Sequence, residues 1–362
     1  MLYYIFLSIF LLIFTILTGY LVYRFNKTFL TKLIKDRGIS RIFLLIIFLT
    51  ALLFLVNDTI NTLIVLIHLF SFLLFYDFII FILKKISKKH INNGISFILT
   101  ILTTVIYLTY GYYLAHHVVE TKYTIEAKKD IGSNNFRLIQ ITDSHIGATM
   151  NGDDFIEYME EINKLKPDIV VVTGDFVDDD TSLNNMIKGC IGLGKLRTKY
   201  GVYFSYGNHD KAYFNYRNFD DLRLRKELNK NNVIILEDEV ELINDSIYLV
   251  GRQDRQVKDR MSADELTKNL DKNKYIIGLD HRPDDYKNEA SSNYDLVLSG
   301  HTHGGQMWPI GQVSVLLGIN DSYYGKKVID DTTFITSSGI GDWQIKFKIG
   351  TISEYVVIDI KN

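Results

Sequence analysis

Residues 294–306 read Tyr-Asp-Leu-Val-Leu-Ser-Gly-His-Thr-His-Gly-Gly-Gln, an apolar run that ends in two histidines set among glycines. The same order, a β-type run followed by polar residues that can bind a metal, occurs four more times upstream. Those four are Phe136–Thr142 with Asp143-Ser144-His145, Ile169–Thr173 with Gly174-Asp175-Phe176-Val177-Asp178, Gly201–Tyr206 with Gly207-Asn208-His209-Asp210, and Tyr275–Leu279 with Asp280-His281-Arg282-Pro283. Strands that alternate with helical stretches predict an α/β domain, and ligands of such domains gather beyond the carboxyl ends of the strands. We therefore expect the five strand ends to form one shared site.

The histidines support a shared site. Residues 118–362 contain five histidines, and all five lie in these clusters: His145, His209, His281, His301 and His303. Because no histidine of this region lies outside the clusters, a shared site explains their positions better than incidental clustering does. The accompanying glycines let the backbone turn sharply and approach a bound ion without a Cβ in the way. The single cysteine, Cys190, excludes an intramolecular disulfide framework and a cysteine-based metal site.

One helix is predicted between the first two runs. Asp153 or Asp154 is expected to cap its beginning, and Pro167 stops it after about Leu165. The segment follows one predicted strand and precedes the next, as the alternation of an α/β domain requires.

The first 117 residues differ in composition from the rest. They hold ten basic and three acidic residues, which leaves 30 basic and 39 acidic residues for 118–362. Stretches of roughly 20 apolar residues cross a bilayer, and four apolar stretches are candidates. These are Leu2–Tyr23, Ile42–Val56, Ile60–Leu83 and Ile95–Tyr113. We predict a membrane module with four transmembrane helices at 1–117, a linker at 118–135 and a catalytic domain at 136–362. A cleaved signal peptide is the alternative for the first stretch, but that stretch lacks a basic leading region and further spans follow it.

Two basic loops predict the orientation of this module. One follows the first stretch and the other follows the third, and both should stay cytoplasmic under the positive-inside bias. Their basic residues are Arg24, Lys27, Lys32, Lys35, Arg37 and Arg41 in the first loop, and Lys84, Lys85, Lys88 and Lys89 in the second. Four alternating spans satisfy both loops only if everything after His117 lies outside. We therefore predict an integral protein of the cell membrane with an extracytoplasmic catalytic domain.

Two ionisable residues lie within the third predicted span. Such residues are functional candidates by default. His68 and Asp77 are nine residues apart, which is close to half a rotation on a helix, so they point to opposite faces and cannot pair locally. We favour helix packing or interfacial hydration over transport chemistry.

The motifs, taken in chain order, resemble those of the calcineurin-like metallophosphoesterase superfamily. The blocks are Asp143-x-His145, Gly174-Asp175-x-x-Asp178, Gly207-Asn208-His209-Asp210, His281 and Gly300-His301-x-His303, and the resemblance covers about residues 136–360. The Gly300–Gln306 run and the His281-x-Pro283-Asp284 block are similar to the bacterial and archaeal branch of membrane-associated phosphodiesterases and UDP-diacylglucosamine hydrolase-like enzymes. The resemblance implies a two-sheet β-sandwich flanked by helices.

The resemblance also implies a role for each position. Asp143, His145, Asp175 and His303 would hold one metal, and Asp175 would bridge to a second that Asn208, His281 and His301 also hold. His209 would lie near the leaving group, with Asp210 orienting its ring. Lys346-Phe347-Lys348 and Ser353-Glu354 stand where the family often has Pro-x-Arg and Pro-Glu, which leaves the substrate contacts there open.

The chemistry of phosphate esters explains this residue set. Two cations roughly 3.5–4 Å apart neutralise the phosphoryl oxygens and acidify a bridging water, and a shared carboxylate suits that spacing. Mixed oxygen and nitrogen ligands favour Mn, Fe or Zn over calcium. His209 is the candidate general acid, with hydrogen bonding to a substrate oxygen as its alternative. Asp178 either orients a ligand or forms part of a turn. Tyr206, Met307 and Trp308 either line a pocket for a lipid tail or pack beneath the site.

The sequence therefore predicts a two-metal phosphoesterase at the membrane surface, acting through a metal-bridging hydroxide. Its substrate is a phosphodiester or a phosphomonoester, with lipid-linked esters among the candidates. A nuclease is one alternative, but the domain is acidic and its local basic stretch, Arg217, Arg223, Arg225 and Lys226, is better explained as a solvated helix face. The other alternative is a membrane-anchored sensor of a phosphorylated ligand whose metal site does not turn over.

Overall fold

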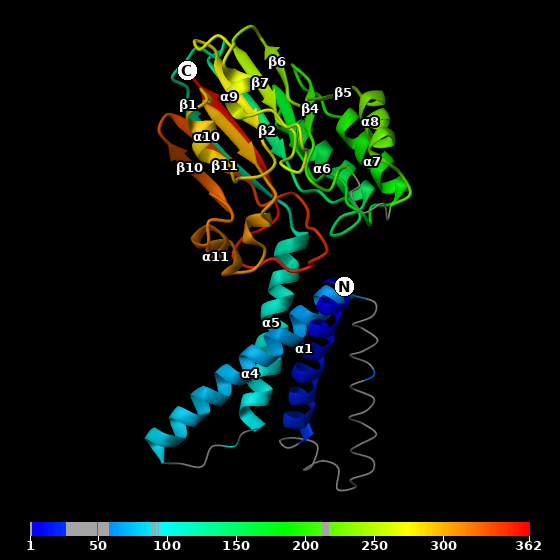
Figure 1. The fold of residues 1–362 in the computed structure, drawn as a ribbon, viewed down its shortest axis with the longest axis vertical. Coiled ribbons are helices and arrows are strands. Elements are labelled where there is room, and N and C mark those ends of the chain that lie inside the picture. Colours follow the sequence, from blue (N-terminus) through cyan, green and yellow to red (C-terminus); the bar gives the residue numbers. More distant parts are fainter. Residues whose placement is uncertain (1, 27–48, 50–57, 89–91, 93, 212–216) are drawn as a thin grey trace. The chain divides into compact units, whose positions relative to one another are not determined.

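The computed structural model describes residues 2–26, 49, 58–88, 92, 94–211 and 217–362 (Figure 1). The chain divides into two compact units, Met1–Gly111 and Tyr112–Asn362. The elements described in the first are helices, and the second contains all the β-strands that the structure describes.

Three long helices belong to the N-terminal part of the chain: α1 (Leu2–Phe25), α4 (Thr59–Ser87) and α5 (Gly94–His116). Each contains one of the predicted spans. α4 and α5 are long and apolar enough to cross a membrane by length and composition. The second predicted span, Ile42–Val56, lies outside the described residues except for Leu49, as does most of the first basic loop.

An ion pair joins α1 to α4. Nη2 of Arg24 donates to Oδ1 of Asp77 at 2.8 Å, and both side chains are largely buried. His68 has other partners: its Nδ1 lies 2.7 Å from the carbonyl oxygen of Ile64, and its ring centroid lies 5.2 Å from that of Tyr107. The two ionisable residues of α4 thus serve separate contacts between or within helices, in agreement with the packing role that we favour for them.

The catalytic unit contains two six-stranded mixed sheets. The first has the order β1-β12-β2-β3-β4-β5 and the second β10-β11-β9-β8-β7-β6. The strands of the first sheet are β1 (Val119–Glu126), β2 (Asn135–Ile141), β3 (Ile169–Thr173), β4 (Val202–Ser205), β5 (Val233–Ile235) and β12 (Glu354–Lys361). Those of the second are β6 (Glu239–Ile243), β7 (Ile247–Gly251), β8 (Tyr275–Leu279), β9 (Leu296–Ser299), β10 (Gly325–Ile329) and β11 (Thr332–Thr336).

Helices cover the outer faces of the two sheets, as Figure 1 shows. They are α6 (Gly152–Lys164), α7 (Leu183–Gly194) and α8 (Asp221–Lys230) along the first sheet, and α9 (Ala263–Thr267) and α10 (Tyr286–Ala290) along the second, with α11 (Ile310–Leu316) beyond. This arrangement confirms the predicted α/β domain with two sheets and flanking helices.

The core explains why these runs form strands. β3 has the sequence Ile-Val-Val-Val-Thr and is buried throughout, as expected of β-branched residues in a parallel strand covered on both faces. Val171 of β3 packs in the same cluster as Ile277 of β8, so this cluster fills the space between the sheets. Val170 and Val172 pack on the other side with side chains of α6 and α7. Because both faces are packed, the strand ends are held in fixed positions.

Two predicted boundaries need correction. Residues 119–126, within the predicted linker 118–135, form β1, which pairs in parallel with β12 along its whole length. The helix between β2 and β3 is capped by Asn151, whose side chain accepts hydrogen bonds from the backbone of Asp153 and Asp154, while the Asp154 carboxylate accepts from Asn151 N. The N-cap is therefore Asn151, and the predicted caps, Asp153 and Asp154, are the residues whose backbone N–H groups it accepts from.

Candidate metal centre

The candidate ligands lie at the carboxyl ends of strands from both sheets. Asp143 follows β2, Asp175 follows β3, His281 follows β8 and His301 follows β9. Asp143 and Asp175 both have φ of 51°, and His301 has φ of 68°. Left-handed backbone at non-glycine residues costs of order 1–3 kcal/mol each and concentrates at functional sites. The chain therefore turns sharply, against local preference, at the positions that the motifs single out.

Two groups of side chains meet at these ends. In the first group, ligand atoms of Asp143, His145 and His303 all lie within 4.8 Å of one another. In the second, ligand atoms of Asp175, His281 and His301 do so. Each group offers one carboxylate and two imidazoles, a donor set that transition metals favour.

Asp175 lies between the two groups. Its Oδ2 is 3.1 Å from Nε2 of His281 in its own group and 3.7 Å from Nε2 of His145 in the other. Its Oδ1 accepts a hydrogen bond from the backbone N–H of His209 at 2.8 Å. A Cβ at Gly207 would come within 2.3 Å of the same Oδ1, so a glycine is needed for the backbone to pass this carboxylate.

Buried polar atoms without partners test whether metals fit here. Within the described residues, Nε2 of His145, Nε2 of His281 and Oδ1 of Asn208 are buried and have no hydrogen-bond partner. A buried polar atom left unpaired costs about 1–3 kcal/mol, and native structures retain few of them. All three residues were predicted as ligands, and coordination would satisfy each atom. The donor set therefore fits two metal ions.

The electrostatics also favour cations. Burial lowers the pKa of His145, but Asp178, Asp175 and Asp143 together raise it to about 9. Burial likewise opposes charge on His281, yet Asp175 raises its pKa to about 10. Burial would raise the pKa of Asp175, but His281 and the neighbouring imidazoles hold it well below its usual range. The carboxylates thus create a negative potential at the point where the unpaired nitrogens lie.

Further residues orient the candidate ligands. Oδ2 of Asp178 lies 3.5 Å from Nδ1 of His145, and its Oδ1 accepts from Asp180 N at 2.9 Å. Asp178 thus contacts a ligand and also stabilises a turn. The carbonyl oxygen of Thr173 lies 2.8 Å from Nδ1 of His281. Such outer contacts fix the tautomer and direction of metal-binding imidazoles.

Sequence reasoning missed one such residue. Oδ1 of Asp342 lies 3.1 Å from Nδ1 of His303 and 3.2 Å from Nζ of the buried Lys348. Asp342 comes six residues after β11, in the segment Ser337-Ser338-Gly339-Ile340-Gly341-Asp342. β11 followed by glycines and an aspartate repeats the pattern of the other strand ends, so this pattern could have identified Asp342.

The positions that depart from the family pattern make internal contacts. Nζ of Lys348 donates to the carbonyl oxygen of Ser338 at 2.8 Å. The Glu354 carboxylate accepts from Ser338 N and Ser337 Oγ, both at 3.0 Å. Both side chains therefore brace the loop that carries Asp342.

His209 borders the first group of ligands. Its ring centroid lies 5.2 Å from that of His145 and 5.6 Å from that of Trp343. Burial lowers its pKa. The side chain is thus close to the centre without belonging to either group of ligand atoms.

The expected role of Asp210 needs correction. Its carboxylate accepts hydrogen bonds from four backbone N–H groups at 2.8–3.1 Å, those of Asp175, Phe176, Val177 and Gly207. These contacts hold the Asp175 loop, whereas the family resemblance implied that Asp210 orients the ring of His209. Burial and the Asp175 charge raise the pKa of Asp210 to about 6.

Two other expectations change in the same region. Arg217 was grouped with a solvated helix face, but it is buried, precedes α8, and donates to the carbonyl oxygen of His209 at 3.2 Å. Tyr206 and Met307 are buried, whereas Trp308 is exposed. Packing thus accounts for the first two residues of the suggested lipid pocket and not for the third.

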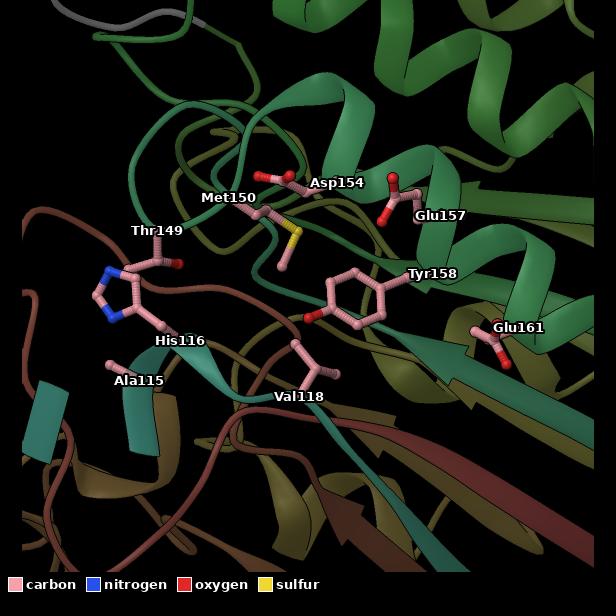
Figure 2. Close-up of a pocket in the computed structure, with 9 residues that line it drawn as sticks. All are labelled: Ala115, His116, Val118, Thr149, Met150, Asp154, Glu157, Tyr158 and Glu161. Atoms are coloured by element: carbon pink, nitrogen blue, oxygen red, sulfur yellow. The ribbon is translucent and has the colours of Figure 1, made fainter. Parts of the chain in front are cut away.

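A separate cavity of about 440 Å³ lies elsewhere in the catalytic unit (Figure 2). Three acidic side chains of α6, Asp154, Glu157 and Glu161, lie along it. The other lining residues are Ala115, His116, Val118, Thr149, Met150 and Tyr158. None of the candidate metal ligands lines this cavity.

Known proteins share these motifs. Residues 136–305 match the family model described as calcineurin-like phosphoesterase. An uncharacterized metallophosphoesterase of Aquifex aeolicus (strain VF5) is 31% identical over 246 residues, which are 66% of this chain and 90% of that relative. The chain belongs to the calcineurin-like metallophosphoesterase superfamily. This metallophosphoesterase is therefore a metal-dependent phosphoester hydrolase, and its two groups of ligands support a dimetal site.

Other relatives cover different shares of this chain. An uncharacterized metallophosphoesterase of Campylobacter jejuni is 28% identical over 307 residues, 81% of this metallophosphoesterase and 78% of the relative. A transmembrane protein with metallophosphoesterase domain from Bos taurus is 27% identical over 234 residues, 61% of this chain and 52% of its own. Together with the two apolar helices, such relatives indicate a membrane protein.

Solved structures match less closely. A dimetal phosphatase from Danio rerio has a TM-score of 0.37 and 13% identity, covering 56% of this chain and 87% of its own. The protein TT1561 of Thermus thermophilus has a TM-score of 0.36 and 13% identity, covering 57% of this chain and 89% of its own.

Proposed function

We propose that this metallophosphoesterase hydrolyses a phosphodiester or phosphomonoester of a lipid-linked substrate at the membrane surface. One observation carries the hydrolytic part of the proposal: Oδ2 of Asp175 lies between the imidazoles of His145 and His281, the arrangement required of a carboxylate shared by two ions. The two helices that are long and apolar enough to cross a membrane support the lipid-linked class, because such an anchor would keep the catalytic unit near lipid.

The proposed ligand sets follow the two groups of side chains. Asp143, His145, Asp175 and His303 would hold one ion. Asp175 would also hold the second, together with Asn208, His281 and His301. Mixed nitrogen and oxygen donors suit Mn, Fe or Zn. When bound, two such ions neutralise phosphoryl charge and lower the pKa of a water molecule.

His209 is the proposed general acid. Its backbone N–H is held by Asp175, so the position of its ring is coupled to the shared carboxylate. A pKa lowered by burial makes the protonated ring a stronger acid toward a departing alkoxide. Asp210 acts indirectly, since it holds the backbone on both sides of the site.

The orientation of the enzyme bears on its substrate. The basic loop residues favour an extracytoplasmic catalytic domain. The His281-x-Pro283-Asp284 block supports a place in the branch with UDP-diacylglucosamine hydrolase-like enzymes. An outward active site favours an envelope lipid over a cytosolic nucleotide-linked lipid as the substrate. A C-terminal reporter that is active only outside the cell would support this orientation, and protease resistance in intact cells would overturn it.

The test uses the purified full chain, with metal content measured alongside turnover. With Mn²⁺ we expect hydrolysis of bis-p-nitrophenyl phosphate or p-nitrophenyl phosphate, two bound ions per chain, and loss of both activity and metal in Asp175→Ala. Asp180→Ala is the matched control, because this carboxylate is exposed and only five residues away. The protein would be a sensor if it binds metal and phosphate but turns over neither ester nor extracted envelope lipids. Turnover of DNA alone would make it a nuclease.

A further inference from the structure

The segment after the second histidine motif has an unusual surface. Residues 307–320 contain no charged side chain. Seven large apolar side chains within this segment are exposed: Trp308, Ile310, Val313, Val315, Leu316, Leu317 and Ile319. Leu316 is 83% exposed, Leu317 is 67% exposed and Trp308 is 64% exposed.

This cluster differs from the other exposed apolar residues of the catalytic unit. Apart from Tyr112 and Tyr113 at the end of α5, those others are spread singly over the unit: Ile191, Leu222, Ile234, Leu242, Met261 and Val328. Single exposed apolar residues are ordinary, but a contiguous exposed patch marks an interaction site or a membrane contact. The segment 307–320 is therefore expected to contact an apolar partner.

The apolar segment is fixed to the metal centre. α11 packs on the short 3-10 helix η2 (His303–Gly305), which carries a candidate ligand. A Cβ at Gly305 would lie 2.6 Å from Cα of Gly311, so the two backbones touch where no other residue type would fit. Whatever α11 binds is thus held within a few residues of His303.

Hydrogen bonds also connect this segment to the point where the chain leaves the membrane helix. Trp308 N donates to the carbonyl oxygen of Ile349 at 2.9 Å. From the same loop, Ser353 N donates to Leu114 O at 3.0 Å and Ser353 Oγ donates to Ala115 O at 2.9 Å. Leu114 and Ala115 belong to the last turn of α5, and that turn lies in the catalytic unit.

The level of the bilayer follows from the same turn. Tyr112 and Tyr113 are exposed aromatic residues at the end of an apolar helix, the composition found at membrane interfaces. They directly precede Leu114, so the interface lies within one helical turn of the residues that Ser353 holds. Because the loop that accepts from Trp308 also binds Leu114 and Ala115, a lipid surface is the apolar partner to which these contacts point.

We propose that residues 307–320 of this protein insert into the interfacial layer of the lipid bilayer, with Trp308, Leu316 and Leu317 in the acyl region. Because the segment has no charge, insertion depends on apolar area and not on anionic headgroups. Insertion brings the loop of His303 to the headgroup layer, where the phosphoester of a lipid lies. The binding itself does not rest on the proposed hydrolysis.

Site-directed spin labelling of the full chain in phosphatidylcholine nanodiscs tests this proposal. Cys190 is fully buried and burial raises the pKa of its thiol, so labelling is selective for an introduced cysteine. Leu317→Cys is the probe, and Leu316→Cys is a second probe. Leu222→Cys on α8 is the matched control, since Leu222 is 68% exposed and lies in the same unit.

We expect the labels at 316 and 317 to collide with oxygen but not with a water-soluble nickel chelate, at a depth of about 5–10 Å below the headgroups. The label at 222 should remain accessible to the chelate, and adding phosphatidylglycerol should leave all three results unchanged. Equal chelate accessibility at 317 and 222 would overturn the proposal. Shielding of 317 from both reagents would assign the patch to protein packing, and spin–spin coupling between copies would assign it to a second copy of the chain.

Discussion

Oδ1 of Asp342 lies 3.1 Å from Nδ1 of His303, and both side chains are buried. The pair is completed by the buried Lys348, whose Nζ lies 3.2 Å from the same oxygen. A carboxylate behind an imidazole directs the other ring nitrogen forward and raises its basicity. In this enzyme the forward nitrogen of His303 is Nε2, which lies 3.6 Å from Oδ1 of Asp143.

Substitution of Asp342 tests this orientation. Asp342→Asn keeps the shape but removes the charge, and we expect the affinity for metal to fall about 10–100-fold, as for other outer-shell partners. Competition with a chelating dye measures the affinity. In Asp342→Asn the ammonium of Lys348 has lost its carboxylate partner, and adding Lys348→Met removes that ammonium. A loss of affinity that persists in the double variant is then due to the lost contact with His303. Wild-type affinity in both variants would contradict the orienting role.

Asp210 should act on stability before it acts on catalysis. Asp210→Ala leaves four buried backbone N–H groups without an acceptor, and each such group costs about 1–3 kcal/mol unless water replaces the carboxylate. We expect a clearly lower free energy of unfolding in denaturant titrations of the metal-free protein. His209→Ala should be near wild type in the same measurement, because among the described residues its side chain has ring contacts with His145 and Trp343 but no hydrogen bond. Equal stabilities would restore the ring-orienting role for Asp210.

Metal binding should strengthen as pH rises. Without metal, the pKa of His145 is raised to about 9 and that of His281 to about 10, so below these values an incoming ion must displace protons. We expect apparent affinity to rise by up to about tenfold per pH unit for each proton displaced. Calorimetry in buffers of different ionisation enthalpy measures the protons released. A His145→Gln/His281→Gln variant should show no such release, and pH-independent binding by the wild type would contradict the assignment.

The stability of the metal-free protein should change in the opposite direction. A folded-state pKa raised above the ordinary value of 6.5 adds stability that is fully present below pH 6.5 and is lost as pH rises through about 9 to 10. The thermal midpoint of the metal-free protein should therefore fall between pH 6.5 and 10. Asp175, whose pKa is lowered, adds a constant stability above its ordinary value of 3.8, so it does not alter the change expected between pH 6.5 and 10. A rising midpoint would show that these imidazoles are not coupled to the carboxylates.

The Arg24–Asp77 pair should hold α1 against α4. Because the two side chains remain partly exposed, we expect Asp77→Ala to lower the free energy of unfolding by about 1–3 kcal/mol, less than for a fully buried pair. The exchange Arg24→Asp/Asp77→Arg should restore part of it. Thermal unfolding in detergent measures the effect. Additive losses in the exchanged variant would show that each side chain serves other contacts.

The sequence predicted the features that depend on neighbours along the chain. β3 and β8 have the predicted bounds because their runs are buried on both faces and therefore uniformly apolar. The candidate ligands could be picked out because each follows such a run directly, and the structure gathers six of them into two groups. The ability of each residue type to bind a metal could be inferred without knowledge of tertiary contacts.

The features that the sequence did not predict depend on distant partners. β1 contacts solvent along much of its length and pairs with β12 more than 200 residues later, so its pattern resembled that of a linker. The Asp210 carboxylate accepts from backbone N–H groups, and because nearly every residue has such a group, the sequence does not indicate which ones it binds. Asp342 and Lys348 approach His303 only because the loop after β11 folds back over the site.

The place of β12 has a consequence for biosynthesis. This strand lies between β1 and β2, so the first sheet stays split into two pieces until residues 354–361 have been made. The apolar helices α4 and α5 precede it by more than 200 residues, so they are made while the sheet is still incomplete. We therefore expect attachment through these apolar helices to precede completion of the first sheet, which carries Asp143 and Asp175 at the ends of two of its strands.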